Sequence, residues 1–218
     1  MSDLLPLFPL PNVVLFPGVF LPLHIFEPRY REMVADALLG DRIIGMTLLR
    51  PGWEADYEGR PPIYPIGCSG VITHFERLPD GRYNIVLRGL DRFRVLEEEA
   101  SRTYRRALVE PLAERSPDPN DRTAVVDLRS KLHSLLSPGV ERHTGGKPEP
   151  VSPYAKATSA MTDEDLVNAL SQYLDLEPLE KLALLQHDTV RARAESLVEL
   201  LEMKILTARS PCSSSVAH

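Results

Sequence analysis

Prolines set among aliphatic side chains constrain the start of this chain more than any other feature. The 218-residue sequence contains 20 prolines, which is about 9% against a usual value of about 5%. Near the N-terminus they separate the apolar runs 4–10, 13–16 and 20–26. Because a proline inside a helix removes a backbone N–H and clashes with the preceding turn, we expect short extended segments there. The strand 20–26 contains Pro22, so it should lie at a sheet edge or a strand end.

A helix and a hairpin follow in the sequence. Pro28 suits the first turn of a helix, apolar residues then recur at helical spacing, and Gly40 can end it. The dipeptide Asp80-Gly81 lies between the β-rich runs 71–78 and 83–90. An Asp-Gly pair in that position is a strong hairpin signal. Further strands are expected at 43–49, 91–96 and 104–112.

The chain changes character at its midpoint. Residues 1–112 are predicted to form a β-rich α+β or barrel-like domain, and not a doubly wound parallel sheet. Residues 113–207 carry leucines at helical spacing, which predicts a helical subdomain. A connection rich in proline and glycine at 137–153 should be flexible. Residues 208–218 have little to bury and are predicted to be a disordered tail.

The charge of the chain excludes some classes of protein. Lysine and arginine total 25 against 31 aspartates and glutamates, which gives a net charge of −6. That balance repels polyanions at long range, so a large nucleic-acid surface is not expected. No apolar run approaches the length of a membrane span, and the N-terminus lacks the positive region of a secretory signal. We therefore expect a cytoplasmic protein with no membrane partner.

The motifs that would carry catalysis do not occur. The nearest match to a phosphate-binding loop ends in Gly146-Lys147-Pro148, where proline replaces the hydroxyl residue that would hold magnesium. No G-x-S-x-G nucleophile motif occurs. Cys68 near His74 offers fewer ligands than a metal site needs, and a buried thiol is the simpler interpretation. We therefore expect no catalytic residue, no metal and no cofactor.

Arginines beside an aromatic residue leave nucleic-acid binding as an alternative. Arg92 and Arg94 flank Phe93, and Arg88 precedes them. Arginine interleaved with aromatic side chains can hold single-stranded RNA by stacking on bases and contacting phosphates. The other interpretation is the polar outer face of an antiparallel strand, which the negative net charge favours.

Four segments together resemble the N-terminal substrate-recognition domain of Lon proteases. They are PLFPLPNVVLFPGVFLPLHIFEPRYREMVADAL (6–38), IIGM (43–46), PIGCSGVI (65–72) and PDGRYNIVLRGLDRFRV (79–95). The likeness covers residues 4 to 206. It implies a PUA-like pseudo-barrel of mixed and antiparallel strands with one inserted helix, followed by a C-terminal helical bundle.

The resemblance also implies a function. Lon proteases continue into an ATPase module and a Ser-Lys peptidase module, and this sequence has no counterpart of either. The protein is therefore expected to be a free-standing, non-enzymatic recognition module that binds unfolded or partner polypeptide segments. An adaptor role in protein quality control and a homo-oligomeric state both fit this expectation. An RNA-binding PUA-like module is the alternative, and a small ligand in the barrel mouth has weaker support.

The string HIFEPRY (24–30) is the part of the sequence most typical of the family. Its polar side chains, which are candidates for a contact surface, are His24, Glu27, Arg29 and Tyr30. The apolar residues between them are expected to fill the core.

A second candidate is the polar loop 51–62. It contains Tyr57 and the only tryptophan, Trp53. Aromatic residues in loops give a large contact area with little loss of entropy, so they are frequent in recognition sites. Two interpretations stay open: Trp53 contacts a polypeptide, or it folds back to cover the barrel mouth.

Overall fold

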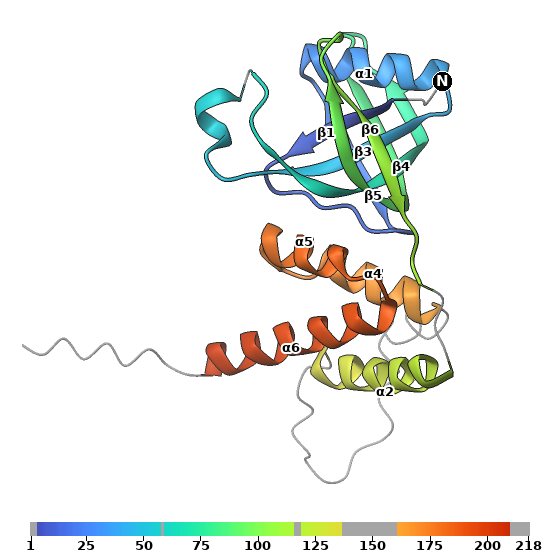
Figure 1. Ribbon diagram of the computed structural model, residues 1–218, viewed down its shortest axis with the longest axis vertical. Coiled ribbons are helices and arrows are strands. Elements are labelled where there is room, and N and C mark those ends of the chain that lie inside the picture. Colours follow the sequence, from blue (N-terminus) through green and yellow to red (C-terminus); the bar gives the residue numbers. More distant parts are fainter. Residues whose placement is uncertain (1–3, 58, 116–118, 137–160, 210–218) are drawn as a thin grey trace, which may run out of the picture. The chain divides into compact units, whose positions relative to one another are not determined.

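The computed structural model describes residues 4–57, 59–115, 119–136 and 161–209 (Figure 1). The chain divides into two compact units. Met1–Arg115 with Asn168–Asp188 form the first, here called the β-rich unit, and Ser116–Val167 with Thr189–His218 form the helical unit. These units differ from the predicted segments, because residues 168–188 pack with the strands. The boundary at residue 112 therefore stays a prediction about independently folding domains.

Six strands form one sheet in the β-rich unit (Figure 1). They are β1 (Leu5–Leu10), β2 (Phe20–Ile25), β3 (Ile43–Leu49), β4 (Ile63–Arg77), β5 (Tyr83–Glu99) and β6 (Arg105–Leu112). The order is β2-β5-β4-β3-β1-β6, and an additional pairing of β5 with β6 closes the strands into a barrel. Among the described strands, β1 and β3 are the one pair that runs in parallel. The predicted α+β fold with a mixed pseudo-barrel and an inserted helix is confirmed.

The barrel closes because β5 changes partner along its length. Its residues 83–88 pair with β2 and its residues 92–99 pair with β6, while β4 pairs along the other edge. Phe93 lies in a buried cluster with Leu7 and Ala107. The strands predicted at 83–90 and 91–96 are thus one strand, and its length allows it to serve two neighbours.

Two proline-bearing strands differ in position. β2, which contains Pro22, pairs with β5 alone among the described strands, so its predicted edge position is confirmed. β1 lies between β3 and β6 and is not an edge strand. It pairs with β6 over Leu5–Leu7 and with β3 over Leu7–Leu10, so Pro6 and Pro9 each have a ladder partner on one side only. A proline is accommodated in a strand when its missing N–H faces the unpaired side.

The apolar run 13–16 was predicted to be extended and forms no strand. Its last residue and the proline that follows it bond instead to side chains of helix α4 (Asp163–Tyr173). Phe16 N donates to Gln172 Oε1 at 3.2 Å, and Asn168 Nδ2 donates to the Pro17 carbonyl at 3.2 Å. The segment crosses β5 so closely that a Cβ on Gly89 would lie 2.0 Å from Phe16 O. These contacts satisfy a buried backbone without a strand partner.

The predicted helix and hairpin are both present. Helix α1 spans Pro28–Leu39, with Pro28 in its first turn and Gly40 as its C-cap. Gly81 has a φ of 83° in the turn between β4 and β5. Asp80 Oδ1 accepts a hydrogen bond from Arg82 N at 3.1 Å, which stabilises the turn.

The remaining helices are α2 (Pro119–Leu136), α4, α5 (Pro178–Gln186) and α6 (Val190–Arg209), as the leucine spacing predicts. Thr162 caps α4, since Asp165 N donates to Thr162 Oγ1 at 3.1 Å. In the helical unit α2 packs with α6, and Lys131 Nζ lies 2.8 Å from Glu202 Oε1.

Helix α6 runs to Arg209, so it includes the first residues of the predicted tail. The rest of that tail and the connection predicted at 137–153 lie outside the described residues. In the described part of the chain, no helix combines the length and the apolar character that crossing a membrane requires.

Replacing Gln172 tests how the segment before β2 is held. We expect Gln172→Ala to lower the free energy of unfolding by about 1–3 kcal/mol, because it leaves the buried Phe16 N–H without its acceptor. Urea denaturation followed by circular dichroism measures this change. Gln186→Ala is the matched control, since Gln186 is exposed at the end of α5. An equal loss in both variants would contradict the role of Gln172.

Candidate functional site

The start of α1 places a carboxylate and a guanidinium side by side. Glu27 is the N-cap of α1 and its side chain does not cap the helix. Its carboxylate instead accepts from Arg29 Nε at 3.0 Å. Arg29 follows Pro28 in the first turn, so its side chain lies over the same helix end. This ion pair is mostly shielded from solvent, with each side chain 17% exposed.

The loop between β3 and β4 brings two aromatic rings to this ion pair. Tyr57 donates its hydroxyl hydrogen to Glu27 Oε1. The Arg29 guanidinium carbon lies 5.0 Å from the centre of the Tyr57 ring. Trp53, in the short 3-10 helix Trp53–Asp56, packs edge-on against Tyr57 with ring centres 5.3 Å apart. The two segments singled out in the sequence therefore meet in one place.

Tyr30 completes this group and connects it to the core. Its side chain is buried and packs on Phe8 with ring centres 4.4 Å apart. The Arg29 guanidinium carbon lies 4.7 Å from the Tyr30 ring centre. We call Glu27, Arg29, Tyr30, Trp53 and Tyr57 the aromatic–ion cluster. Trp53 is half-buried.

Burial sets the ionisation of the tyrosines in this region. It raises the pKa of Tyr30 to about 12, and the negative charge of Glu27 adds to the effect. Burial also raises the pKa of Tyr57, and the hydrogen bond to Glu27 raises it further. Both hydroxyls are therefore neutral hydrogen-bond donors at physiological pH.

A pocket of about 190 Å³ adjoins the aromatic–ion cluster. Its basic lining residues are Arg29, Arg60, Arg102 and Arg105. Its aromatic lining consists of tyrosine rings, from Tyr30, Tyr57 and Tyr104. Among the described residues that line it, none carries a carboxylate. We call it the arginine pocket, and its composition suits a ligand with a negative group attached to an apolar part.

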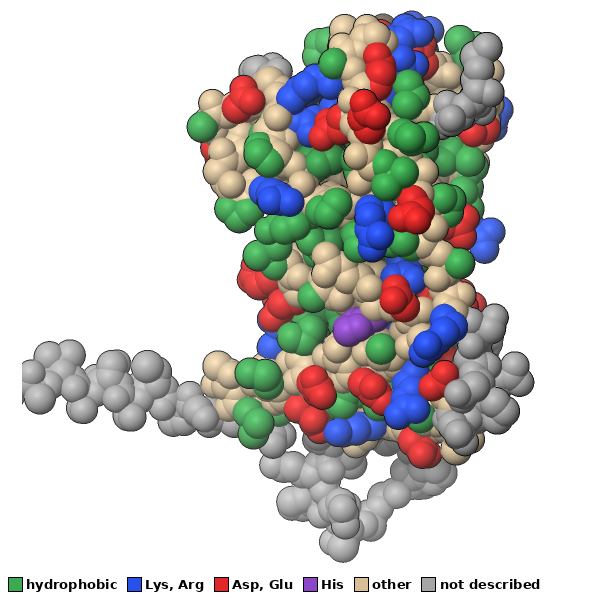
Figure 2. Space-filling model, viewed as in Figure 1, with side chains coloured by type: hydrophobic (Ala, Val, Ile, Leu, Met, Phe, Trp, Pro, Cys, Tyr) green, Lys and Arg blue, Asp and Glu red, His purple; other side chains and the backbone are tan. Residues whose placement is uncertain are grey.

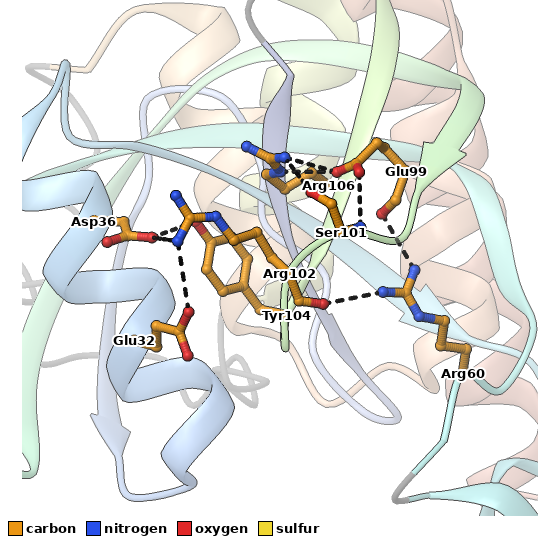
Figure 3. Close-up of polar contacts among 8 residues, drawn as sticks. All are labelled: Glu32, Asp36, Arg60, Glu99, Ser101, Arg102, Tyr104 and Arg106. Atoms are coloured by element: carbon orange, nitrogen blue, oxygen red, sulfur yellow. Dashed lines mark hydrogen bonds and ion pairs between the residues drawn. The ribbon is translucent and has the colours of Figure 1, made fainter.

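The turn between β5 and β6 forms one wall of the arginine pocket (Figure 3). Arg102 faces α1, with its Nη1 3.6 Å from Asp36 Oδ2 and 3.8 Å from Glu32 Oε1. Tyr104 donates to the same Asp36 oxygen at 2.8 Å. Burial, followed by this hydrogen bond, raises the pKa of Tyr104 to about 12. The turn is thus anchored to the helix by charge and by a neutral donor.

Arg60 reaches the same turn from the opposite loop (Figure 3). Its guanidinium donates to the carbonyl oxygens of Glu99 and Arg102 at 3.2 and 3.3 Å. The Glu99 carboxylate accepts from Ser101 N and from Arg106, which lowers its pKa to about 2. These contacts hold the loops 50–62 and 99–105 together across the arginine pocket.

His24, also a candidate, belongs to a different part of the surface. It is exposed on β2, where its Nδ1 lies 2.7 Å from Asn84 Oδ1. Its Nε2 lies 3.3 Å from Arg82 Nη1. It lines neither the arginine pocket nor the aromatic–ion cluster.

The arginine–aromatic set proposed for RNA does not form a surface. Phe93 is 2% exposed inside the barrel, and Arg92 is 1% exposed. Arg92 Nη1 donates to the Leu185 carbonyl of α5 at 3.1 Å, so α5 covers it. Arg88 and Arg94 are exposed, and Arg94 pairs with Glu110 at 3.4 Å. On the face shown in Figure 2, basic and acidic side chains are interspersed, which does not suit a polyanion.

Sequence reasoning did not assign Arg60, Arg102, Tyr104 and Arg105 to the candidate site. The dense string RTYRR (102–106) was a usable signal. Arg105 is 6% exposed and pairs with Glu98 at 3.2 Å. Only the approach of the two loops shows that these side chains share a pocket.

Comparison with known proteins agrees with this architecture. Residues 4–203 match the family model of the ATP-dependent protease La (LON) substrate-binding domain. This chain belongs to the Lon substrate-binding domain family. Lon protease of Flavobacterium johnsoniae is 28% identical over 207 residues, and the match covers 92% of this chain and 24% of that protein. Lon protease 2 of Myxococcus xanthus is 28% identical over 203 residues, covering 93% and 24%. The chain thus spans about a quarter of the length of these Lon relatives.

Solved Lon domains share the fold. The N-terminal domain of the Mycobacterium avium complex Lon protease superposes with a TM-score of 0.69 at 15% identity, covering 92% of this chain and 98% of that one. A Lon N-terminal domain protein from Xanthomonas campestris gives a TM-score of 0.56 at 24% identity, covering 96% and 99%. At these identities the likeness concerns the fold of the Lon domain.

The raised pKa of Tyr30 predicts a loss of stability at alkaline pH. An unfolded tyrosine ionises near pH 10, whereas Tyr30 in the folded state ionises near 12. The contribution of this pKa difference to the free energy of unfolding is therefore complete below pH 10. It is lost as the pH rises from 10 to 12, at about 1.4 kcal/mol per pH unit at most. We expect the free energy of unfolding of Tyr30→Phe to fall less steeply over this range than that of the unchanged protein. Urea denaturation at a series of pH values measures both slopes, and equal slopes would contradict the burial of Tyr30.

Proposed function

We propose that this protein is a non-catalytic recognition module that binds unfolded or partner polypeptide segments through the aromatic–ion cluster. The observation that carries the proposal is the meeting of Trp53 and Tyr57 with the Glu27–Arg29 ion pair beside the arginine pocket. Membership of the Lon substrate-binding domain family supports it. Rigid aromatic residues beside a charged rim are typical of surfaces that bind peptides.

The aromatic–ion cluster also explains how varied polypeptides can be bound. Trp53 and Tyr57 offer apolar faces with few rotatable bonds, so contact with a client costs little entropy. The Tyr57 hydroxyl and Arg29 are already bonded to Glu27, so Tyr57 is held in place before a client arrives. A surface fixed in this way binds by shape and apolar contact, and it does not require one client sequence.

An adaptor role in protein quality control extends this proposal. A chain that holds a polypeptide and has no catalytic group of its own needs a partner to act on the bound client. The family's recognition role is consistent with such a division of work. Self-association would add avidity for clients with several exposed segments.

Substitution in the aromatic–ion cluster should weaken client binding. We expect Trp53→Ala and Tyr57→Ala to raise the Kd for an unfolded polypeptide such as β-casein by about tenfold or more, as loss of a buried aromatic contact does. Isothermal titration calorimetry measures the Kd. Phe75→Ala is the matched control, because Phe75 is an exposed aromatic residue on β4 outside the cluster. A loss at Phe75 without a loss at Trp53 would place the binding surface elsewhere.

The purified chain should not alter the bound client. We expect no ATP hydrolysis and no cleavage of β-casein above the background of a heat-denatured sample. A coupled phosphate assay and electrophoresis of the client measure these activities. Turnover that rises in proportion to the concentration of pure protein would contradict a non-catalytic module.

A further inference from the structure

We propose that the arginine pocket binds a carboxylate group of the client polypeptide, with Arg60 as its principal contact. This inference rests on the proposed function and names the chemical group that the site recognises. It is carried by the charges around the pocket, by the free donors of Arg60 and by the size and walls of the pocket.

The charges around the pocket are compensated for every arginine except Arg60. Arg29 pairs with Glu27, Arg102 faces Glu32 and Asp36, and Arg105 pairs with Glu98. Among the described residues, the Arg60 guanidinium donates to backbone carbonyl oxygens only. Four carboxylates thus face the four arginines of the pocket, two of them at Arg102. Among the described residues that line the pocket, Arg60 is the guanidinium without a carboxylate partner, and its single charge matches a monoanion such as a carboxylate better than a phosphate with a charge of about −2.

Arg60 also has donors to spare. A guanidinium carries five N–H groups in a planar fork that fits a carboxylate. The two carbonyl contacts at 3.2 and 3.3 Å fix the plane of the Arg60 group and leave the other N–H groups available. Arg60 is exposed, so a client can reach it without opening the protein.

Neighbouring charges favour an anion at this place as well. Burial lowers the pKa of Arg105, Glu98 and Tyr30 act in the opposite direction, and the positive charges of Arg60 and Arg29 lower it by smaller amounts. Arg60 and Arg29 are thus each close enough to repel Arg105. A bound carboxylate would relieve that repulsion, which adds to its affinity.

The pocket has room for a carboxylate and a small apolar side chain. Its volume is about 190 Å³, and Pro9, Leu49 and the tyrosine rings provide apolar walls. A polypeptide offers this combination at its C-terminal residue and also at an aspartate or glutamate beside an apolar residue. The net charge of −6 repels polyanions at long range, so a nucleic acid is disfavoured as the occupant.

Three forms of one tryptophan-free, otherwise neutral decapeptide test the proposal. The first has a free C-terminal carboxylate, and the second has a C-terminal amide. The third ends in an aspartate whose α-carboxyl group is amidated, so its carboxylate is that of the side chain. Trp53 is the only tryptophan in the protein, so its fluorescence reports binding. We expect one or both of the carboxylate-bearing forms to bind about tenfold more tightly than the neutral amide, as a charge-assisted hydrogen bond provides. The tighter of the two identifies the source as the chain end or the side chain.

Variants connect the preference to the arginine pocket. In Arg60→Gln we expect the tenfold preference to disappear. The readout is the ratio of the Kd values for the neutral amide and the carboxylate form, because loss of the contacts to the Glu99 and Arg102 carbonyls weakens the binding of all forms alike. Arg94→Gln is the matched control, because Arg94 is an exposed arginine paired with a surface carboxylate and does not line the pocket. It should keep the full preference. An unchanged preference in Arg60→Gln, or an equal loss in Arg94→Gln, would overturn the assignment to this pocket.

Other outcomes separate the inference from the proposed function. If the neutral amide binds as tightly as both carboxylate forms, polypeptide binding stands and the carboxylate inference fails. If no form gives a saturable change, both fail. Displacement of the acid peptide by inorganic phosphate at a tenfold lower concentration than by acetate would overturn the carboxylate in favour of a phosphoryl group.

Discussion

Hydrogen bonding along the whole of β5 is the interaction on which the β-rich unit depends. Residues 83–88 bond to β2 and residues 92–99 to β6, so a single strand both carries the edge strand and closes the barrel. Closure leaves β2 as the one strand with a single neighbour among the described strands. It also fixes the ends of β5 and β6, and therefore the turn between them. The position of Arg102 and Tyr104 beside α1 follows from that closure.

The candidate site depends on a second constraint, the polar contacts that join two loops to each other and to the start and surface of α1. In one loop, the Tyr57 hydroxyl donates to Glu27, and the Arg60 guanidinium donates to carbonyl oxygens of the turn between β5 and β6. From that turn, Arg102 pairs with the carboxylates of α1 and Tyr104 donates a hydrogen bond to one of them. Each loop is held by several polar contacts. The pocket between them can therefore keep its shape before a client binds, and the half-buried Trp53 is placed at its side.

Several features of the fold could be predicted because they depend on local sequence. Pro28 and Gly40 mark the ends of α1, and Asp80-Gly81 marks the hairpin, since each acts through its own backbone geometry. Pro22 indicated an edge strand because it cannot donate to a ladder. The run 13–16 was predicted to be extended but forms no strand, since Phe16 N bonds to Gln172 and the Pro17 carbonyl bonds to Asn168, more than a hundred residues away. The arginine–aromatic set does not form one surface for a similar reason, because α5 covers Arg92 on the outer face of β5.

The sequence by itself determined the family resemblance, the α+β class, the inserted helix and the two segments that contain the aromatic–ion cluster. These follow from patterns within short stretches of chain, where local propensity and residue spacing carry the information. Only the tertiary structure decided that Tyr57 meets Glu27, that Arg60 and Arg102 share a pocket and that His24 lies apart from it. Those outcomes depend on how distant loops approach once the barrel has closed, and closure is a property of strand pairing across the whole unit.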